Sequence, residues 1–255
     1  MKKNAVISAV FWLVCCNVFS QVAFNDADKV LNKSEESFIE NAVLYEMDFY
    51  NRIFPKDTFH FADVHFTIFK KYSQFIAYQS NKQNIHHSSL GYYVFATKEI
   101  VVCKEKQPKQ QFLKTCAHEL SHFLLMQRMN APAWLNEGLA TYFGNMKFLS
   151  KTATHDKNKY LTARIKTMIE LRDIDLQDFV AWDYGKFGKM SFANDSYGYA
   201  IAYGMTLFLI NKNENLTMNI IREIGKNNNT IQAFDTCYIG GFEQFEKDFL
   251  AYYSK

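Results

Sequence analysis

The sequence has 255 residues, of which 48% are apolar and 22% are charged, values typical of a globular protein. This length is sufficient for one large domain, and the 24 Phe and 15 Tyr residues can supply much of a well-packed core. The formal net charge of +3 gives no reason to expect nucleic acid or an anionic membrane surface as a partner.

The first twenty residues are typical of a secretory signal peptide. Lys2 and Lys3 give a positive start, an apolar run covers residues 5–14, and a cleavage point follows before Gln21. We therefore expect residues 1–20 to be removed and the protein to be exported, as a periplasmic or secreted protein. Loss of two lysines lowers the net charge to about +1. No later segment is long and apolar enough to span a bilayer.

The cysteines leave two questions open. Cys15 and Cys16 lie in the leader, where an uncleaved anchor or an attached lipid is the alternative to cleavage. Cys103, Cys116 and Cys237 remain in the mature part. An oxidising compartment permits one disulfide among these three, with one thiol left over, and the sequence does not choose the pair.

Strand patterns dominate the first part of the mature chain, after an opening helix. Apolar residues at helical spacing predict that helix over residues 28–53, and Pro55 ends it. Residues 80–89 are polar and are expected to form an exposed loop. Strands are predicted at 64–69, 75–78, 91–95 and 99–103.

From Pro108 onwards the apolar spacing becomes helical. A first helix begins there and stops at residues 130–132, and a second begins at Pro132 and ends near Gly144. Because strands come early and helices late, we expect an α+β fold. It would be a single domain over 21–255, with a strand-rich lobe at about 55–130 and a helical lobe at about 131–255. Further helices are predicted at about 157–172, 197–212, 216–225 and 241–253.

One segment of the first of these helices has the spacing of a zinc site. His118-Glu119-Leu120-Ser121-His122 is an H-E-x-x-H segment. Residues four apart share a helix face, so both imidazoles can reach one ion at about 2.0–2.1 Å. Glu119 projects roughly 100° away around the helix. It is therefore predicted to act as a general base on water, and not as a ligand.

A catalytic zinc usually takes three protein ligands and leaves a fourth position to water. Glu137 follows on the second predicted helix, which the turn at 130–132 can fold back against the first. We therefore predict one zinc ion per chain, bound by His118, His122 and Glu137. The alternatives are a structural zinc without catalysis, and an exported helical binding module in which the two histidines bind no metal.

The segments HELSH and PAWLNEGLA together resemble the gluzincin group of zinc metallopeptidases, specifically its bacterial peptidase MA-like families. The resemblance covers about residues 90–250 and is strongest around 115–145. It implies a zincin-like fold and hydrolysis of a peptide or protein substrate. The group's third ligand is the Glu of a W-L-x-E-G-x-A segment, which matches Glu137. A G-A-M-E-N-like segment, with which the aminopeptidase branch grips a free amino terminus, is absent from the sequence, so endo- and exopeptidase activity both stay open.

Hydrolysis also needs a donor for the oxyanion that develops on the substrate carbonyl. Tyr197, Tyr199 and Tyr203 are the candidates, and the alternative for each is aromatic packing. The resemblance favours Tyr199, because residues 199–203 are similar to the Y-A-x-x-x helix of the group. The predicted catalytic residues are therefore Glu119 and Tyr199. Upstream, the strand at 91–95 or that at 99–103 is expected to offer an edge to an extended peptide.

Overall fold

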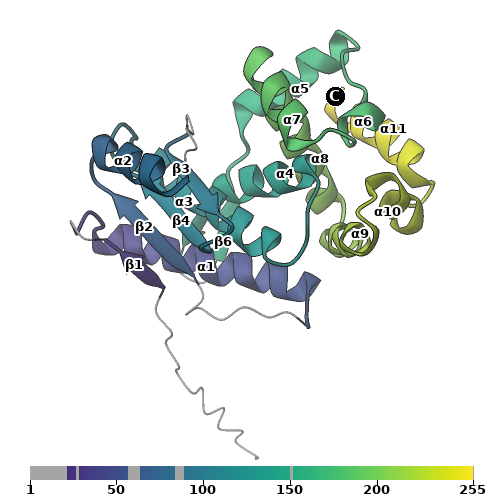
Figure 1. Cartoon of the computed structure of the whole chain (residues 1–255). Coiled ribbons are helices and arrows are strands. Elements are labelled where there is room, and N and C mark those ends of the chain that lie inside the picture. The colour runs from purple at the N-terminus through teal and green to yellow at the C-terminus, as the bar shows by residue number, and fades with distance from the viewer. Residues whose placement is uncertain (1–21, 27–28, 57–63, 84–88, 150–151, 255) are drawn as a thin grey trace, which may run out of the picture.

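The computed structural model describes residues 22–26, 29–56, 64–83, 89–149 and 152–254. The predicted signal peptide, with Cys15 and Cys16, lies outside the described residues. In the described part, one sheet and its helices occupy one side of the molecule and the later helices occupy the other (Figure 1). This mixed content agrees with the α+β prediction. No helix in the described ranges combines the length and hydropathy needed to cross a bilayer.

Four strands form the main sheet, in the order β1-β2-β4-β3. β1, β2 and β4 are parallel, and β3 runs antiparallel to β4. β4 is therefore paired on both sides, and the expectation that its edge could bind a peptide is wrong. β3 is the edge strand next to it among the described strands. The bounds are β1 (Ala23–Asn25), β2 (His65–Phe69), β3 (Gly91–Val94) and β4 (Glu99–Cys103).

Helices cover both faces of this sheet. Alternate side chains such as Phe66 and Ile100 join the main core beneath α1 (Lys33–Ile53) and α3 (Lys109–Met126), while Val101 faces a smaller core. α1 begins at Lys33, later than the predicted residue 28. The reason is a capping box, in which the Asn32 side chain accepts from backbone N–H groups of the first turn and the Glu35 carboxylate accepts from the Asn32 N–H.

The smaller core lies beneath α2 (Tyr72–Gln83), where the sequence predicted a strand at 75–78 and a loop from residue 80. The strand prediction is therefore wrong, and the loop prediction is wrong for residues 80–83, which are helical, while Ser89 is an exposed bend. Phe75 and Gln79 lie one helical turn apart, and both are buried. The Phe75 ring packs against Phe69 and Tyr92 of the sheet. Residues 84–88 lie outside the described part.

The second half is mainly helical, as predicted, but a hairpin that the sequence did not predict interrupts it. Phe148 of this hairpin packs against Phe38 and Tyr45 of α1, so it joins the later part of the chain to the first helix. The predicted helices correspond to α5, α8, α9 and α11, whereas α6, α7 and α10 were not predicted. The bounds are α4 (Ala133–Gly144), β5 (Met146–Leu149), β6 (Thr152–His155), α5 (Lys159–Glu170), α6 (Leu176–Phe179), α7 (Tyr184–Ala193), α8 (Tyr197–Lys212), α9 (Glu214–Asn227), α10 (Thr230–Cys237) and α11 (Gly241–Tyr253).

α4 connects the two halves because it packs against both α3 and α8. Pro132 is its N-cap and Pro108 is that of α3, as expected for helices that begin at these prolines. Gly144 lies against α3, where an added Cβ would come within 3.4 Å of the His118 Cβ. The close approach of α3 and α4 fixes the separation of the side chains that the two helices direct toward each other.

The cysteines of the described part form no disulfide. Cys103, Cys116 and Cys237 are all free thiols. Cys103 and Cys116 are buried in different cores, on opposite faces of the sheet. Burial, the largest influence in each case, raises the pKa of both thiols. These two thiols are therefore packing residues.

Candidate metal centre

Three of the predicted side chains converge between α3 and α4. His118 and His122 stand one turn apart on α3, and their Nε2 atoms are 3.1 Å apart. Glu137 reaches them from the first half of α4, with its Oε2 atom 3.7 Å from each Nε2. These atoms form a group that can hold a metal ion. The turn between the two helices therefore folds α4 back as the sequence suggested.

The spacing and surroundings of these atoms fit a metal ion. Four ligands at about 2.0–2.1 Å in a tetrahedron lie about 3.4 Å from one another. The observed separations of 3.1 and 3.7 Å bracket that value. Within the described part of the chain, the Oε2 atom of Glu137 is also buried without a hydrogen-bond partner. A buried carboxylate oxygen without a partner is costly, and a cation at this point would satisfy it.

Each imidazole is oriented by a group on α4. Asn136 Oδ1 lies 3.0 Å from His122 Nδ1, and His118 hydrogen-bonds the backbone of Ala140. A partner at one ring nitrogen leaves the other nitrogen free to bind a metal. Both Nε2 atoms face Glu137. The second helix therefore contributes one of the three candidate ligands and the groups that contact the other two.

The two histidines differ in their electrostatic surroundings. Burial lowers the pKa of His118 well below its ordinary value, so this ring stays neutral and keeps a lone pair for a metal. Burial acts in the same direction on His122, but the negative charges of Glu137 and Glu119 outweigh it and raise its pKa. The two carboxylates therefore favour positive charge beside His122, whereas His118 remains neutral.

Glu119 lies beside this group and is not one of the three ligands. Its side chain is buried, and it approaches the start of β3, where an added Cβ on Gly91 would come within 3.0 Å of the Glu119 Cγ. Burial raises the pKa of Glu119 to about 7, the nearby Glu137 adds to the effect and His122 opposes it. A carboxyl group in this position can exchange a proton near neutral pH.

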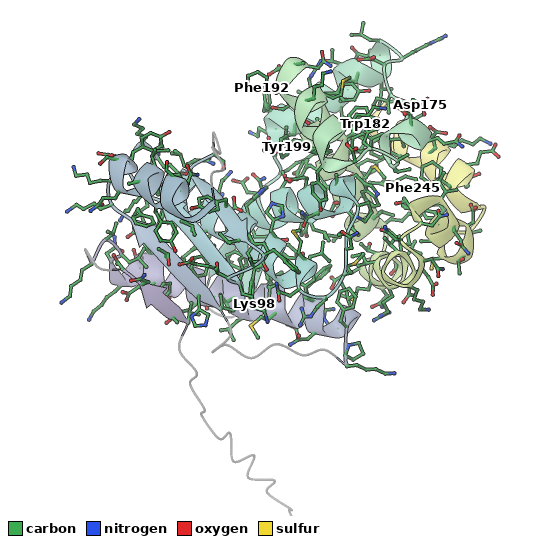
Figure 2. All side chains as sticks on the ribbon, viewed as in Figure 1. Lys98, Asp175, Trp182, Phe192, Tyr199 and Phe245 are labelled. Carbon is green, nitrogen blue, oxygen red and sulfur yellow. The ribbon has the colours of Figure 1, made fainter. Side chains whose placement is uncertain are left out.

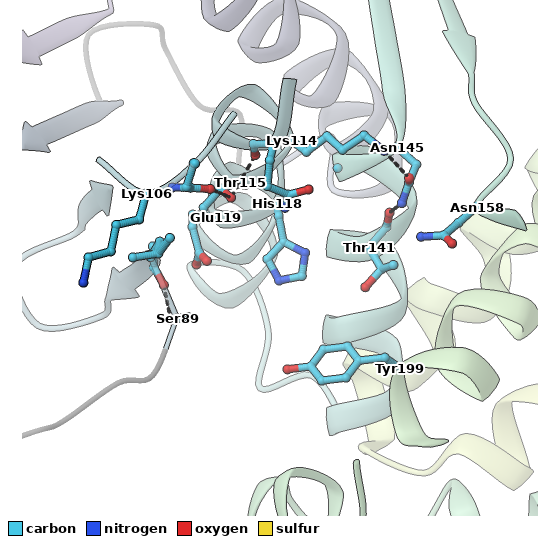
Figure 3. A pocket seen from close by; sticks show the side chains of 15 residues that line it. Ser89, Lys106, Lys114, Thr115, His118, Glu119, Thr141, Asn145, Asn158 and Tyr199 are labelled. Carbon is cyan, nitrogen blue, oxygen red and sulfur yellow. Dashed lines mark hydrogen bonds between the residues drawn. The ribbon is translucent and has the colours of Figure 1, made fainter. Parts of the chain in front are cut away.

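The structure separates the three tyrosine candidates. Tyr199 lines the same cavity as His118 and Glu119 (Figure 3), and it stands at the border between the sheet side and the later helices (Figure 2). The charge of Glu137, together with burial and Glu119, raises the pKa of Tyr199, so its phenol keeps the proton it would donate.

The other two tyrosines make hydrogen bonds away from this cavity. The Tyr197 hydroxyl donates to the Asp173 carbonyl oxygen. The Tyr203 hydroxyl accepts from the Asn158 N–H at 2.8 Å, and its ring stacks on that of His155. Neither hydroxyl has a place in the metal centre, and packing explains both.

An open cleft gives access to the centre. One cavity of about 460 Å³ and another of about 380 Å³ share Gly91, His118, Glu119 and Tyr199 in their linings. The smaller one also contains His122 and Glu137. They are adjoining parts of one cleft, which passes between the β3 edge and α8 with the metal-binding group at its middle.

Three residues of this region were not identified from the sequence. They are Gly91, which makes room for Glu119, Asn136, which contacts His122, and Tyr184, which lines the smaller cavity. The Tyr184 hydroxyl donates to the Ala131 carbonyl oxygen at 3.0 Å and has a second hydrogen bond with the Asn136 side chain. Of the three, only Asn136 could have been suspected from the sequence, because it directly precedes Glu137.

Comparison with known proteins finds a partial match, which carries no assigned activity. A family model described as "Protein of unknown function (DUF1570)" matches residues 113–229. The matched stretch includes His118, Glu119, His122, Glu137 and Tyr199. No curated protein matches the chain. The case for a function therefore depends on the site itself.

Proposed function

We propose that this chain is a zinc-dependent peptidase with a zincin-like fold, of the gluzincin type. The observation that carries the proposal is the convergence of His118, His122 and Glu137 beside an open cleft, with the Glu119 carboxyl next to them. Two imidazoles and one carboxylate are a donor set that suits zinc, whereas Mg²⁺ and Ca²⁺ prefer oxygen ligands. Three ligands also match a catalytic site better than a structural one, which usually has four.

Each group has a defined part in hydrolysis. Bound zinc supplies Lewis acidity, which makes water nucleophilic at neutral pH and polarises a carbonyl. Glu119 would accept a proton from water as the water oxygen forms the new C–O bond, and would then pass that proton to the leaving amine nitrogen as the C–N bond breaks. Tyr199 donates a hydrogen bond to the oxyanion that develops on the carbonyl. The edge of β3, the last strand of the described sheet, would align an extended peptide along the cleft.

The pattern of residues 1–20 supports a further part of the proposal, that the peptidase acts outside the cytoplasm in the periplasm or medium. The substrate is a peptide or protein. The absence of a fourth protein ligand among the described residues of the group disfavours the structural-zinc alternative, in which Glu119 would have no task.

The test is Glu119→Gln, which keeps the side-chain shape and removes the base. We expect zinc to stay at one ion per chain and hydrolysis of a broad peptide library to fall by about 10²–10⁴-fold. Glu40→Gln, at an exposed carboxyl of α1, is the matched control and should keep full activity. Metal content and cleavage-site profiling are measured on the same samples.

Two outcomes would contradict the proposal. If Glu119→Gln protein cleaves peptides as fast as the wild type, Glu119 is not the general base. Bound zinc whose chelation unfolds the protein, with no peptide in the library cleaved, would instead support a structural metal.

A further inference from the structure

The larger cavity of the cleft extends away from the metal-binding group along α3 and α4 (Figure 3). Lys114 and Thr141 line it, each one helical turn from a ligand: Lys114 precedes His118 on α3, and Thr141 follows Glu137 on α4. The two helices that hold the ligands therefore also form this part of the cleft.

The charge in this cavity is positive. Lys114 is half-buried, and its ammonium donates to the neutral Asn145 Oδ1 at 3.0 Å. The Asn145 amide is itself fixed, because its Nδ2 donates to the Thr141 carbonyl oxygen at 2.8 Å. Within the described ranges no carboxylate makes an ion pair with Lys114, and nearby Asp156 is paired with Lys147 at 3.0 Å.

The other charged groups in the lining do not neutralise Lys114. Lys106 is a second cation, and its ammonium lies 3.8 Å over the Tyr72 ring. Glu119 is the acidic residue of the lining, and it faces the metal-binding group. A half-buried ammonium with a neutral partner attracts a carboxylate more strongly than a fully hydrated one, because screening by water is weaker there.

We propose that this cavity is a carboxylate-binding subsite of the cleft, in which Lys114 pairs with a carboxylate of the bound peptide. This inference rests on the proposed peptidase function. One helical turn separates Lys114 from His118, a rise of about 6 Å, and an extended peptide rises about 3.3 Å per residue. The carboxylate would therefore lie one or two residues from the bond that is cleaved. This carboxylate could belong to an acidic side chain of the peptide or to its free C-terminus.

The experiment measures binding, so that it does not depend on turnover. Zinc-loaded Glu119→Gln protein is titrated with peptides of equal length and blocked ends that carry Asp, Asn or Lys at one scanned position. We expect the Asp peptide to bind about tenfold more tightly than the Asn peptide at its best position. A second series with a free C-terminal carboxylate and no acidic side chain distinguishes the two sources of the group.

Variants assign the preference to one ammonium. Adding Lys114→Gln to the Glu119→Gln protein should abolish the Asp preference, and adding Lys114→Arg should keep most of it. Lys109→Gln is the matched control. Lys109 carries the same charge on the same helix, but its ammonium donates to Ser34 Oγ of α1 and does not line the cavity. This control should keep the tenfold preference.

The outcomes separate the subsite from the proposed function. The subsite proposal is wrong if Asp and Asn peptides bind equally at every position and free and amidated C-termini also bind equally. It is also wrong if the preference for a carboxylate survives Lys114→Gln. Peptides that bind with the expected preference, together with wild-type protein that cleaves none of them, support the subsite and reject the peptidase.

Discussion

At the scale of single residues, the three tyrosines Tyr197, Tyr199 and Tyr203 of helix α8 have different surroundings although they are close in sequence. Tyr199 alone of the three candidates lines the described cleft. Tyr197 and Tyr203 make hydrogen bonds with the backbone of other segments. Tyr197 and Tyr199 point in different directions because two residues along a helix are separated by about 200° around its axis. Tyr203 lies one turn beyond Tyr199 on the same face, and its hydroxyl instead accepts a hydrogen bond from the Asn158 N–H.

Replacing the Tyr199 hydroxyl should therefore affect catalysis and leave folding intact. We expect Tyr199→Phe to lower kcat/KM by about 10²–10³-fold with unchanged zinc content. Tyr197→Phe is the matched control. It loses one hydrogen bond worth about 1 kcal/mol of folding free energy but should keep its activity. Peptide hydrolysis and thermal unfolding of both variants check this, and equal activities would leave Tyr199 as a packing residue.

Asn136 offers a second prediction at this scale, because it contacts the ring nitrogen of His122 that faces away from Glu137. Removing such a partner typically lowers metal affinity by 10–100-fold. We expect that loss for Asn136→Ala, and a smaller one for Tyr184→Phe, since the Tyr184 hydroxyl hydrogen-bonds Asn136, which in turn contacts His122. Competition with a chelator of known affinity measures both. Unchanged affinity in Asn136→Ala would mean that packing orients the ring.

These residues also mark how far the sequence could predict the centre. The positions of His118, His122 and Glu119 relative to one another follow from helix periodicity, which is a local property. Glu137 required one further step, the turn that brings α4 onto α3. Tyr184 comes from a helix that the sequence did not predict, so its contact with Asn136 depends on tertiary packing and could not be predicted.

At the scale of helices and strands, the predictions held where the apolar spacing extended over several turns, as in α3, α8 and α9. They failed where the local apolar pattern was ambiguous, as in α2, or very brief, as in the hairpin. In α2 the residues Phe75, Ile76 and Tyr78 favour strands by propensity, but the sheet buries Phe75 and Gln79 together, which selects the helical period. Hairpin β5–β6 contains one alternation, Met146 and Phe148 buried with Lys147 exposed, which is too short to separate from a loop.

The packing of α4 against α8 depends on a glycine at their crossing. A Cβ added to Gly138 would come 2.4 Å from Thr206 Oγ1 and 2.5 Å from the Ala202 carbonyl oxygen, so the helices would have to separate. We expect Gly138→Ala to lower the free energy of unfolding by about 1–3 kcal/mol. It should also weaken zinc binding, because Gly138 follows Glu137 directly.

Gly188 provides the comparison for this prediction. It lies inside α7 with no atom within 4 Å of an added Cβ. Gly188→Ala should therefore raise the free energy of unfolding by about 0.5–1 kcal/mol, through the lower entropy of the unfolded chain. Urea denaturation of the two variants and the wild type measures these differences in the free energy of unfolding. A Gly138→Ala protein as stable as Gly188→Ala would show that the helix crossing tolerates the extra carbon.

At the scale of the whole molecule, one apolar core extends from the sheet through α3 and α4 to α11. α1 packs across both halves, with contacts to α3, α9 and β5. Glu46 of α1 is fully buried, and among the residues that the structure describes neither of its carboxyl oxygens has a hydrogen-bond partner. Burial raises the pKa of Glu46 well above its ordinary value of 4.5. The folded protein therefore keeps this proton at pH values where the unfolded chain has lost it.

This proton gives the stability of the molecule a defined pH dependence. As the pH rises above about 4.5, the unfolded chain binds less proton at Glu46 than the folded one, so its contribution to the free energy of unfolding falls by about 1.4 kcal/mol per pH unit until the raised pKa is reached. Glu46→Gln removes this titration. Its stability relative to the wild type should therefore increase with pH in urea denaturation at pH 5, 6 and 7. Glu40→Gln, at an exposed position on the same helix, should show a constant difference. Parallel pH curves for Glu46→Gln and wild type would mean that the carboxyl of Glu46 titrates alike in both states.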